Sequence, residues 1–304
     1  MNMSEPTQFS TEGLRGEMLH DEPMSRHTSW RAGGFAQRMY RPADLADMRQ
    51  FLQQTPASEA LIAVGLGSNL LVRDGGIKGT VLQMAGALTE LRMDGDLVYA
   101  QAGVPGARLA RFAATNNLCG AEFFVGIPGT LGGMLAMNAG CYGGETWQKV
   151  TRVQVLTRGG ELIERTPGEY EVGYRHVLLK EKGEEFFVGA WLKLEAGDVE
   201  AARQGIKALM EKRSATQPLN LPNAGSVFRN PPGNHAAKII EGCGLKGRRI
   251  GGAQVSEKHA NFIVNVGGAT AKDIEDLIIE VQATVFQQTG IELHPEVRII
   301  GEMK

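Results

Sequence analysis

The chain has 304 residues, 42% of them hydrophobic and 22% charged, which is the composition of an ordinary globular protein. This length exceeds one ordinary hydrophobic core, so we expect two or three domains. The 32 Lys and Arg residues nearly balance the 34 Asp and Glu residues, giving a net charge of -2. A chain so balanced lacks the positive field that binds phosphate backbones, which argues against nucleic acid as a partner.

Residues 1–21 carry charges throughout and contain no apolar segment, so we expect neither a signal peptide nor a membrane anchor. No later stretch reaches the roughly 20 apolar residues of a membrane span. The three cysteines form no CxxC pair and no zinc-ligand pattern, which predicts free thiols and no metal site. We therefore expect a cytoplasmic protein in which the three cysteines, Cys119, Cys141 and Cys243, are free thiols.

The first half of the chain alternates predicted helices, strands and glycine loops. Residues 1–22 lack periodicity, and we expect them to be mobile. Apolar residues at helical spacing predict a helix over 42–54, and Leu61–Val64 predicts a buried strand that ends at Gly65. The other elements predicted here are strands over 80–84 and 97–102 and a helix over 106–117.

The middle of the chain is rich in strands joined by turns, and it does not contain repeated βαβ units. From Asp198 the chain becomes more helical, with prolines at 218 and 222 after the first predicted helix. This order predicts an α+β fold. The elements predicted are strands over 151–157, 162–163, 186–194, 260–266 and 296–300, and helices over 198–217, 236–241 and about 270–288.

Forty glycines are well above the average share of about 7%, and they gather in three clusters, 65–79, 120–144 and 242–252. Glycine lets the backbone approach a ligand closely, so such clusters predict cofactor-binding loops, with tight turns as the alternative. The first cluster resembles a GxGxxG fingerprint but has Leu70 at the third glycine position and continues as a strand. This departure argues against a nicotinamide-binding Rossmann fold.

The second cluster, Glu122–Gly144, has seven glycines and two phenylalanines in 23 residues with hardly any charge. Backbone donors and apolar walls of this kind suit a diphosphate joined to a flat ring. Gly65–Asn69 with Gly126–Gly133 and Asn138–Gly140 resembles the FAD-binding domain of vanillyl-alcohol-oxidase-type flavoproteins. A non-covalent FAD is the cofactor that this resemblance implies.

Further motifs narrow the resemblance to the UDP-N-acetylenolpyruvoylglucosamine reductases of bacterial peptidoglycan synthesis. These motifs run in order from about Met24 to Glu302. The short stretch between His176 and Phe186 is similar to the second, shorter subtype, which lacks an inserted loop with a substrate-clamping tyrosine. The motifs are Arg26–Trp30 with Gly33 and Gly34, Tyr174-Arg175, Asn223–Pro231 and Pro295–Arg298.

The resemblance implies an FAD-binding domain of the vanillyl-alcohol-oxidase/PCMH type over 23–197 and an α+β substrate-binding domain over 198–304. The first domain would consist of two α+β subdomains, about 23–85 and 86–197. NADPH would be the hydride donor, and we expect a monomer. The implied FAD-binding residues are Gly65, Leu66, Gly67, Ser68, Asn69, Leu70, Gly126, Ile127, Pro128, Gly129, Thr130, Gly132, Gly133, Asn138, Ala139 and Gly140.

The family reaction reduces an enolpyruvyl ether to a lactyl ether, which places negative charge on the substrate carboxylate. Arg175 matches the family's catalytic arginine, and its planar cation suits a carboxylate. Ser226 matches the proton donor, and Glu296 matches a third residue that bonds the reacting carboxylate. Considered without the resemblance, Arg175 and Glu296 could also form ordinary ion pairs, and Ser226 could be a turn residue. The implied substrate contacts are Tyr174, Arg213, Asn230, Lys258 and His259.

Two other functions fit parts of the pattern. An FAD oxidase of alcohols would keep the glycine loops but would have no use for the Asn223–Ser226 and Pro295–Arg298 motifs. A nucleotide-sugar binding protein without catalysis would need no flavin. The resemblance favours the reductase, with a role in cell wall biogenesis and thereby in cell shape and division.

Overall fold

The computed structural model describes residues 12–304, which form two compact units. The first unit contains the described residues through Leu19 together with Arg38–Gly65 and Gly79–Leu209. The second is assembled from three stretches, His20–Gln37, Leu66–Lys78 and Met210–Lys304. The division is therefore not the sequential one, at residues 197 and 198, that the sequence suggests.

The reason for this difference is a strand pairing between distant parts of the chain. Strand β4 (Leu70–Val72) pairs in parallel with β20 (Arg298–Ile300), close to the C-terminus. Two parallel strands that pair must be joined by a long connection, and the connection between β4 and β20 spans most of the chain. This pairing places residues 66–70, the part of the first glycine loop that follows Gly65, in the same unit as the C-terminal residues.

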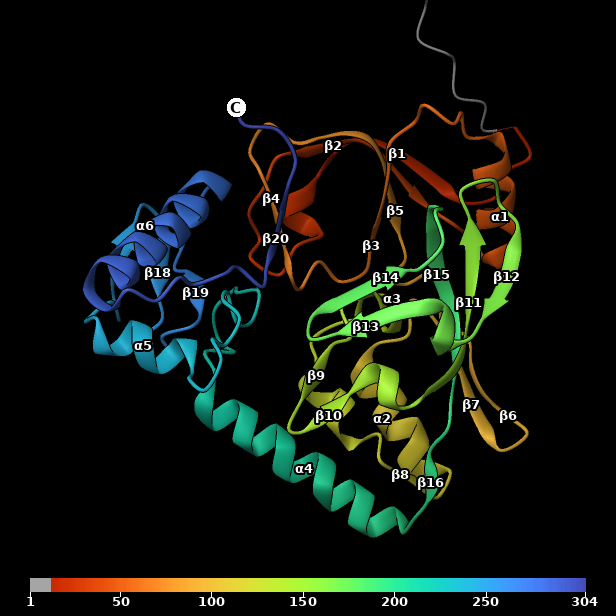
Figure 1. Cartoon of the computed structure of the whole chain (residues 1–304). Coiled ribbons are helices and arrows are strands. Elements are labelled where there is room, and N and C mark those ends of the chain that lie inside the picture. The colour runs from red at the N-terminus through yellow and green to blue at the C-terminus, as the bar shows by residue number, and fades with distance from the viewer. Residues whose placement is uncertain (1–11) are drawn as a thin grey trace, which may run out of the picture. The chain divides into compact units, whose positions relative to one another are not determined.

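The first unit contains two larger sheets, several two-stranded pairs and four helices, and parts of β1, β2, β5 and α4 extend into the second unit (Figure 1). Its strands are β1 (Glu17–Pro23), β2 (Phe35–Arg41), β3 (Leu61–Val64), β5 (Ile77–Gln83), β6 (Leu91–Asp94), β7 (Leu97–Gln101), β8 (Leu118–Cys119), β9 (Gly140–Cys141), β10 (Gly144–Glu145), β11 (Val150–Thr157), β12 (Leu162–Arg165), β13 (Tyr170–Gly173), β14 (His176–Leu179), β15 (Glu185–Leu192) and β16 (Glu195–Ala196). Its helices are α1 (Leu45–Gln54), α2 (Gly106–Thr115), α3 (Leu131–Ala136) and α4 (Val199–Thr216). The sheet orders are β1-β2-β5-β3 and, fully antiparallel, β12-β11-β15-β7-β6.

The first unit has two hydrophobic cores, and the one beside the four-stranded sheet also includes Leu156, Phe186 and Val188 of the five-stranded sheet. Helix α1 begins at the N-cap Asp44, whose side chain accepts a hydrogen bond from the Asp47 amide. Its apolar face buries Phe51 against Tyr40 of β2, with the two rings stacked 4.1 Å apart. The second core lies between α2, α3 and the five-stranded sheet, and includes Leu109, Phe124, Leu135, Val153 and Leu192.

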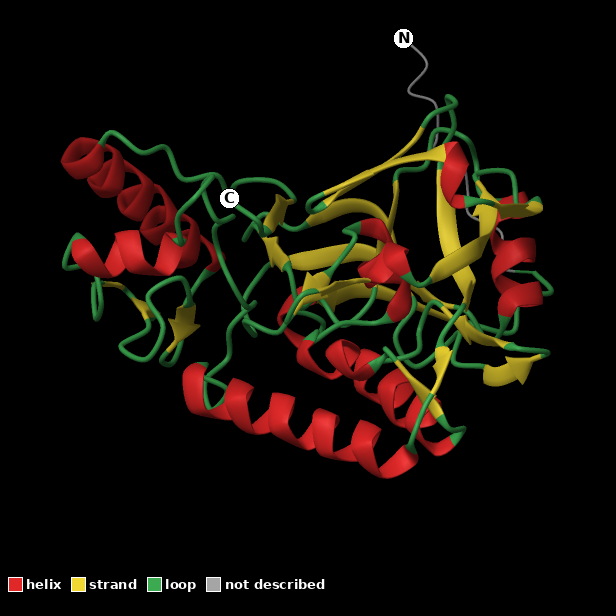
Figure 2. Ribbon diagram, turned by 60° about the horizontal axis from the view of Figure 1, so that its bottom comes forward, coloured by secondary structure: helices red, strands yellow, loops and turns green. Residues whose placement is uncertain are grey.

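The second unit packs α5 (Ala236–Gly242) and α6 (Ala271–Thr289) against a three-stranded sheet, and the two helices lie side by side in both ribbon views (Figures 1 and 2). Helix α6 begins with a capping box between Thr270 and Asp273 and ends at Gly290 in the left-handed conformation. The N-terminal Trp30 enters this core and donates its indole N–H to the Ile263 carbonyl at 2.8 Å. The sheet consists of β17 (Arg249–Ile250), β18 (Ala253–Val255) and β19 (Ile263–Asn265).

The predicted α+β class is confirmed, and the predicted helices are present with ends that differ by up to three residues. Two predicted strands are shorter than expected. The strand expected over 260–266 is only β19, because residues 259–262 close a turn. The strand expected from 296 begins at Arg298, because the Glu296 amide bonds the Val227 carbonyl at 2.7 Å instead.

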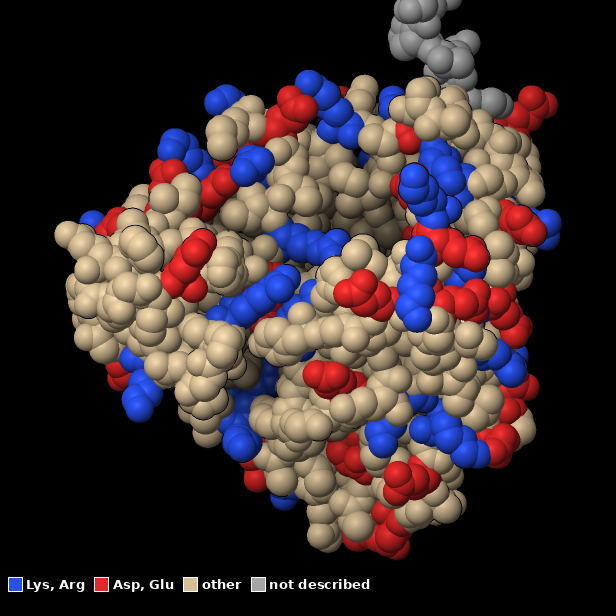
Figure 3. Space-filling view, in the orientation of Figure 1, with Lys and Arg blue, Asp and Glu red and all other residues tan. Residues whose placement is uncertain are grey.

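The expectation of a mobile stretch over 1–22 is wrong for residues 17–22, which belong to β1; its first eleven residues lie outside the described part of the chain. The surface mixes charges of both signs, as the face in Figure 3 shows, in keeping with the balanced count. Across residues 12–304, no helix combines the length and the hydropathy that a bilayer crossing needs. The same residues contain no cluster of His, Cys, Asp and Glu side chains that could hold a metal.

A buried carboxylate fixes the start of the described chain to α1. Asp47 is 1% exposed and accepts hydrogen bonds from the Tyr40 hydroxyl at 2.6 Å and from the backbone amides of Arg15 and Ala43. Burial alone would raise the pKa of Asp47, but these donated hydrogen bonds outweigh it and lower the pKa below its ordinary value. The carboxylate is therefore charged in the native protein at neutral pH.

We expect Asp47→Asn to lower the free energy of unfolding by about 2 kcal/mol at pH 7, because charge-assisted hydrogen bonds to a buried group are lost. Since the native pKa lies below the unfolded one, this contribution is full above the unfolded pKa and disappears as the pH falls through the native pKa. Urea unfolding of both proteins from pH 7 down to pH 3 measures it. The exposed Asp21→Asn is the control, and a gap between wild type and Asp47→Asn that stays constant with pH would contradict the assignment.

Candidate active site

Gly65 and the second glycine cluster meet at the end of β3, within the first unit. Gly65 follows that strand, and a Cβ placed on it would lie 2.4 Å from the Thr130 hydroxyl at the start of α3. Gln83, at the end of β5, donates its side-chain amide to the Gly65 carbonyl at 3.3 Å. Only glycine allows these segments to approach so closely.

This junction contains buried polar atoms that the protein leaves unsatisfied. The side-chain oxygens of Gln83 and Thr130 are both buried, and neither has a hydrogen-bond partner within residues 12–304. Such atoms are costly unless a ligand or water completes them. These two oxygens fit a polar ligand that supplies hydrogen-bonding groups, and FAD is such a ligand.

The Gly126–Gly133 loop lies directly against the five-stranded sheet. The amides of Leu131 and Gly132 donate to the carbonyls of Val104 and Ala102 at 2.9 and 2.8 Å. A Cβ on Gly132 would lie 3.0 Å from the Ala102 Cβ, whereas a Cβ on Gly133 would meet nothing within 4 Å. One face of the loop is therefore packed on protein, and the backbone at Gly133 is open.

The remainder of the first glycine loop, Leu66–Leu70, belongs to the second unit. Gly67 has a φ of +59°, and a Cβ there would lie 2.0 Å from the His27 carbonyl oxygen, so no other residue fits. The amide of Ser29 donates to the Gly67 carbonyl at 3.2 Å. Residues of the Arg26–Trp30 motif therefore pack against this loop and hydrogen-bond to it.

Arg175 lies in the first unit, at the tip of the hairpin formed by β13 and β14. Gly173 pairs with His176, so Tyr174 and Arg175 make the two-residue turn. Arg175 has a φ of +55°, a left-handed conformation that is unfavourable for a side chain of this size. Its guanidinium lies 5.1 Å from the Tyr174 ring centre and donates to the Gly140 carbonyl at 3.1 Å. A strained arginine in a turn that would suit glycine indicates a function for the side chain.

Ser226 and Glu296 lie on adjacent backbone segments of the second unit. The amide of Glu296 donates to the carbonyl of Val227 at 2.7 Å, and Phe228 bridges to Pro295. The structure therefore brings together two predicted residues that are 70 positions apart. The Asn69 side chain donates to the Glu296 carbonyl at 3.1 Å, which places the first glycine loop beside them.

A buried asparagine fixes the segment that carries Ser226. The side chain of Asn261 accepts from the Phe228 amide at 2.9 Å and donates to the Phe228 carbonyl at 2.8 Å. The backbone carbonyl of Asn261 also accepts a hydrogen bond from the Val227 amide at 2.8 Å. Asn261 is 3% exposed, so these bonds are shielded from water.

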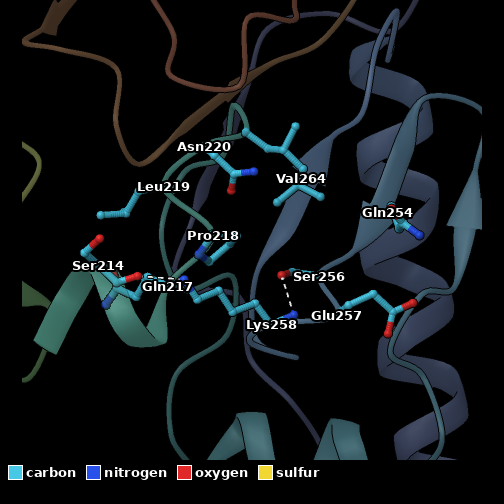
Figure 4. A pocket seen from close by; sticks show the side chains of 11 residues that line it. Ser214, Gln217, Pro218, Leu219, Asn220, Gln254, Ser256, Glu257, Lys258 and Val264 are labelled. Atoms are coloured by element: carbon cyan, nitrogen blue, oxygen red, sulfur yellow. Dashed lines mark hydrogen bonds between the residues drawn. The ribbon is translucent and has the colours of Figure 1, made fainter.

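The second unit also contains a pocket of about 480 Å³ beside the end of α4 (Figure 4). Ser214 and Gln217 face Ser256 and Lys258 across it, and the Lys258 ammonium donates to the Ser214 carbonyl at 2.6 Å. Arg213, one residue before Ser214 of the pocket lining, donates a hydrogen bond to the Gln217 side chain at 3.1 Å. The other lining residues are Pro218, Leu219, Asn220, Leu221, Gln254, Glu257 and Val264.

His259 follows the pocket residues and differs from them in burial. Its ring packs edge-on against Phe262 at 4.7 Å, and burial lowers the pKa of the imidazole. The Nδ1 atom of His259 is buried and has no partner within the described residues. Asn230 is exposed and accepts a hydrogen bond from the Ala236 amide at the start of α5.

Sequence reasoning missed two residues of this region, Gln83 and Asn261. Gln83 is a single polar residue near the end of an apolar strand, and such a position is the one signal that could have indicated it. Asn261 carries no local signal, because its partners lie 33 positions away in the sequence.

Two family models match separate parts of the chain. Residues 36–166 match the model described as FAD binding domain. Residues 217–300 match the C-terminal domain of UDP-N-acetylenolpyruvoylglucosamine reductase. A flavin-binding domain that precedes a separate α+β domain defines the class of the protein, an FAD-containing oxidoreductase.

Similar proteins then identify the family. UDP-N-acetylenolpyruvoylglucosamine reductase of Thiobacillus denitrificans is 58% identical over 95% of this chain and 94% of that protein. The enzyme of the same name from Methylococcus capsulatus is 55% identical over 99% of both chains. A solved UDP-N-acetylenolpyruvylglucosamine reductase from Thermus caldophilus superimposes with a TM-score of 0.81 at 30% identity, covering 94% of this chain and 99% of that one. This chain belongs to the UDP-N-acetylenolpyruvoylglucosamine reductase family, which confirms the resemblance seen in its motifs.

The left-handed turn at Arg175 leads to a stability prediction. Arg175→Gly and Arg175→Ala remove the same side-chain contacts, but only glycine adopts this φ without strain. We expect the glycine variant to be more stable than the alanine variant by about 1 kcal/mol, the reverse of the usual order in regular secondary structure. Urea denaturation measures the difference, and an alanine variant as stable as the glycine variant would refute the strain.

Proposed function

We propose that the protein reduces the enolpyruvyl ether of UDP-N-acetylglucosamine enolpyruvate to UDP-N-acetylmuramate, a step of peptidoglycan precursor synthesis, with NADPH as the hydride donor. The observation that carries this is the combination of an FAD-binding domain with the adjacent Ser226 and Glu296 segments in a C-terminal domain of this reductase family. We place the enzyme in the cytoplasm, as a monomer, with a role in cell shape and division through the cell wall.

FAD, when bound, accepts a hydride from NADPH and supplies one to the substrate. Gly65, Gln83, Thr130 and the open backbone at Gly133 would hold it in the first unit, since these positions combine unsatisfied polar atoms with space. The rest of the proposed FAD contacts are the backbone of 66–70, 126–133 and 138–140.

Arg175 would bind the substrate carboxylate and stabilise the negative charge that develops there. Addition of hydride at the β-carbon moves an electron pair toward the carboxylate and gives an enediolate. A guanidinium keeps its charge at all relevant pH values and offers two parallel donors to a carboxylate. Since the charge is larger in the transition state than in the ground state, this interaction accelerates the reaction instead of only tightening binding.

Ser226 would then donate its hydroxyl proton to the α-carbon, which completes the lactyl ether. A serine hydroxyl is a weak acid, but an enediolate is a strong base, so a well-placed hydroxyl is sufficient. The Asn261 hydrogen bonds fix the segment that follows Ser226, and Asn69 fixes the backbone at Glu296. We assign Glu296 to a hydrogen bond with the reacting carboxylate.

The UDP portion would occupy the pocket at the end of α4. Lys258 supplies a cation at the pocket rim, and Arg213 lies one residue before Ser214 of the lining. His259, neutral because burial lowers its pKa, has an unsatisfied nitrogen for a polar ligand atom. We assign these three residues, with Tyr174 and Asn230, to substrate binding.

The visible absorption of the purified protein tests the function most directly. We expect a yellow protein whose flavin absorption bleaches on addition of NADPH without oxygen and recovers on addition of the enolpyruvyl sugar. Recovery with oxygen but not with the sugar would indicate an alcohol oxidase instead. A colourless protein that takes up no flavin would indicate a nucleotide-sugar binder.

Replacing Ser226 by alanine separates the two halves of the reaction. Bleaching by NADPH should be unchanged, whereas recovery with the enolpyruvyl sugar should slow by about 100-fold or more, since general acid catalysis contributes this much. Stopped-flow absorption measures both rates. Equal loss in both would remove the serine from the proton-donor role.

A further inference from the structure

We propose that Asn138, supported by Glu145, is a positioning residue for Arg175. This inference rests on the proposed function only in assigning Arg175 to the substrate carboxylate. The contacts that carry it all lie within the first unit. They connect the second glycine cluster to the hairpin that presents Arg175.

The Asn138 side chain is buried and uses each of its hydrogen-bonding groups. It is 3% exposed, and its amide nitrogen donates to the Gly173 carbonyl at 3.2 Å and to the Glu145 carboxylate at 3.0 Å. Its side-chain oxygen accepts from the Trp147 amide at 3.2 Å. A primary amide has two N–H donors and one oxygen, so all of them are engaged. Any contribution of residues 138–140 to flavin binding would then come from their backbone.

The Asn138–Gly140 segment holds the Arg175 turn at two points. Gly173, whose carbonyl Asn138 binds, begins the turn, and the Arg175 guanidinium itself donates to the Gly140 carbonyl at 3.1 Å. Gly140 pairs with Glu145 in the β9–β10 hairpin, and a Cβ on Gly140 would lie 2.5 Å from the Gly144 carbonyl oxygen. The segment is therefore tightly packed and can serve as a fixed reference for the turn.

The turn needs such support because its own conformation is unfavourable. Arg175 at a φ of +55° has a left-handed backbone, and residues of this kind persist only where surrounding contacts over-determine them. Glu145 orients the Asn138 amide by accepting one of its two hydrogens, which leaves the other for Gly173. Without the amide, the turn would relax toward right-handed conformations and carry the guanidinium away from its place.

The test compares Asn138→Ala and Asn138→Asp with wild type in the FAD-loaded enzyme. Asp keeps the size of Asn but has no N–H donor and places a second carboxylate beside Glu145, so it should slow reoxidation at least as much as Ala does. We expect reoxidation by the enolpyruvyl sugar to slow about 10- to 100-fold, because displacement by about 1 Å has such an effect. Reduction by NADPH should slow by a smaller factor than reoxidation, because the Asn138 side chain contacts the Arg175 hairpin whereas its proposed flavin contact is through the backbone. Thr146→Val is the matched control: Thr146 is equally buried and bonds the Ala139 carbonyl, but it does not touch the turn.

A second variant distinguishes positioning from a general structural effect. In an Arg175→Ala background, Asn138→Ala should slow reoxidation by no more than about twofold further, because the group it positions is already absent. In flavin-free protein, hydrogen exchange over residues 170–179 should be faster in Asn138→Ala than in wild type or Thr146→Val.

Three results would overturn the inference: full reoxidation activity in Asn138→Ala, equal slowing of both half-reactions, or effects that multiply in the Arg175→Ala background. If wild-type reduced flavin were not reoxidised by the enolpyruvyl sugar, the proposed function would fail instead. The exchange experiment needs neither flavin nor substrate, so unchanged exchange in Asn138→Ala would reject the contact independently.

Discussion

The parallel pairing of β4 with β20 is the contact on which the arrangement of the candidate residues in the second unit depends. It joins residues 70–72 to residues 298–300 and brings the strand that follows the first glycine loop next to the C-terminal motif. Asn69 then bonds the Glu296 carbonyl, and the Glu296 amide bonds Val227, beside Ser226. This pairing thus helps to bring together Asn69 of the first glycine loop, a candidate carboxylate-binding residue and a candidate proton donor from three distant parts of the sequence.

The protein accepts local instability where its proposed chemistry takes place. Arg175 has a left-handed backbone, and the side-chain oxygens of Gln83 and Thr130 are buried without protein partners. Ordinary packing would remove such features, because each costs free energy of folding. Their neighbours, by contrast, are well bonded: Asn138 uses its amide groups fully, and Asn261 bonds Phe228 through both its side-chain nitrogen and its side-chain oxygen. Rigid, satisfied residues next to strained or open ones are what a site requires that must hold charged groups in fixed places.

Two buried asparagines bind backbone groups on either side of the candidate residues. Asn261 binds both backbone groups of Phe228, which fixes the segment after Ser226. Asn138 binds the Gly173 carbonyl at the start of the Arg175 turn. In each case a short amide side chain bonds the backbone of a segment distant in the sequence. Their burial strengthens these bonds, because no water competes for them.

The sequence by itself determined the local features: the helices, the α+β class, the glycine loops, and the motifs that carry Arg175, Ser226 and Glu296. These depend on periodicity and residue type over short windows, which the sequence states directly. Only the tertiary structure decided that residues 66–78 belong with the C-terminal stretch, that Glu296 pairs with Val227 before its strand begins, and that Asn138 binds the Arg175 hairpin. The reason is that these contacts join residues far apart in the chain, and hydrogen-bond partners at such distances leave no trace in local composition.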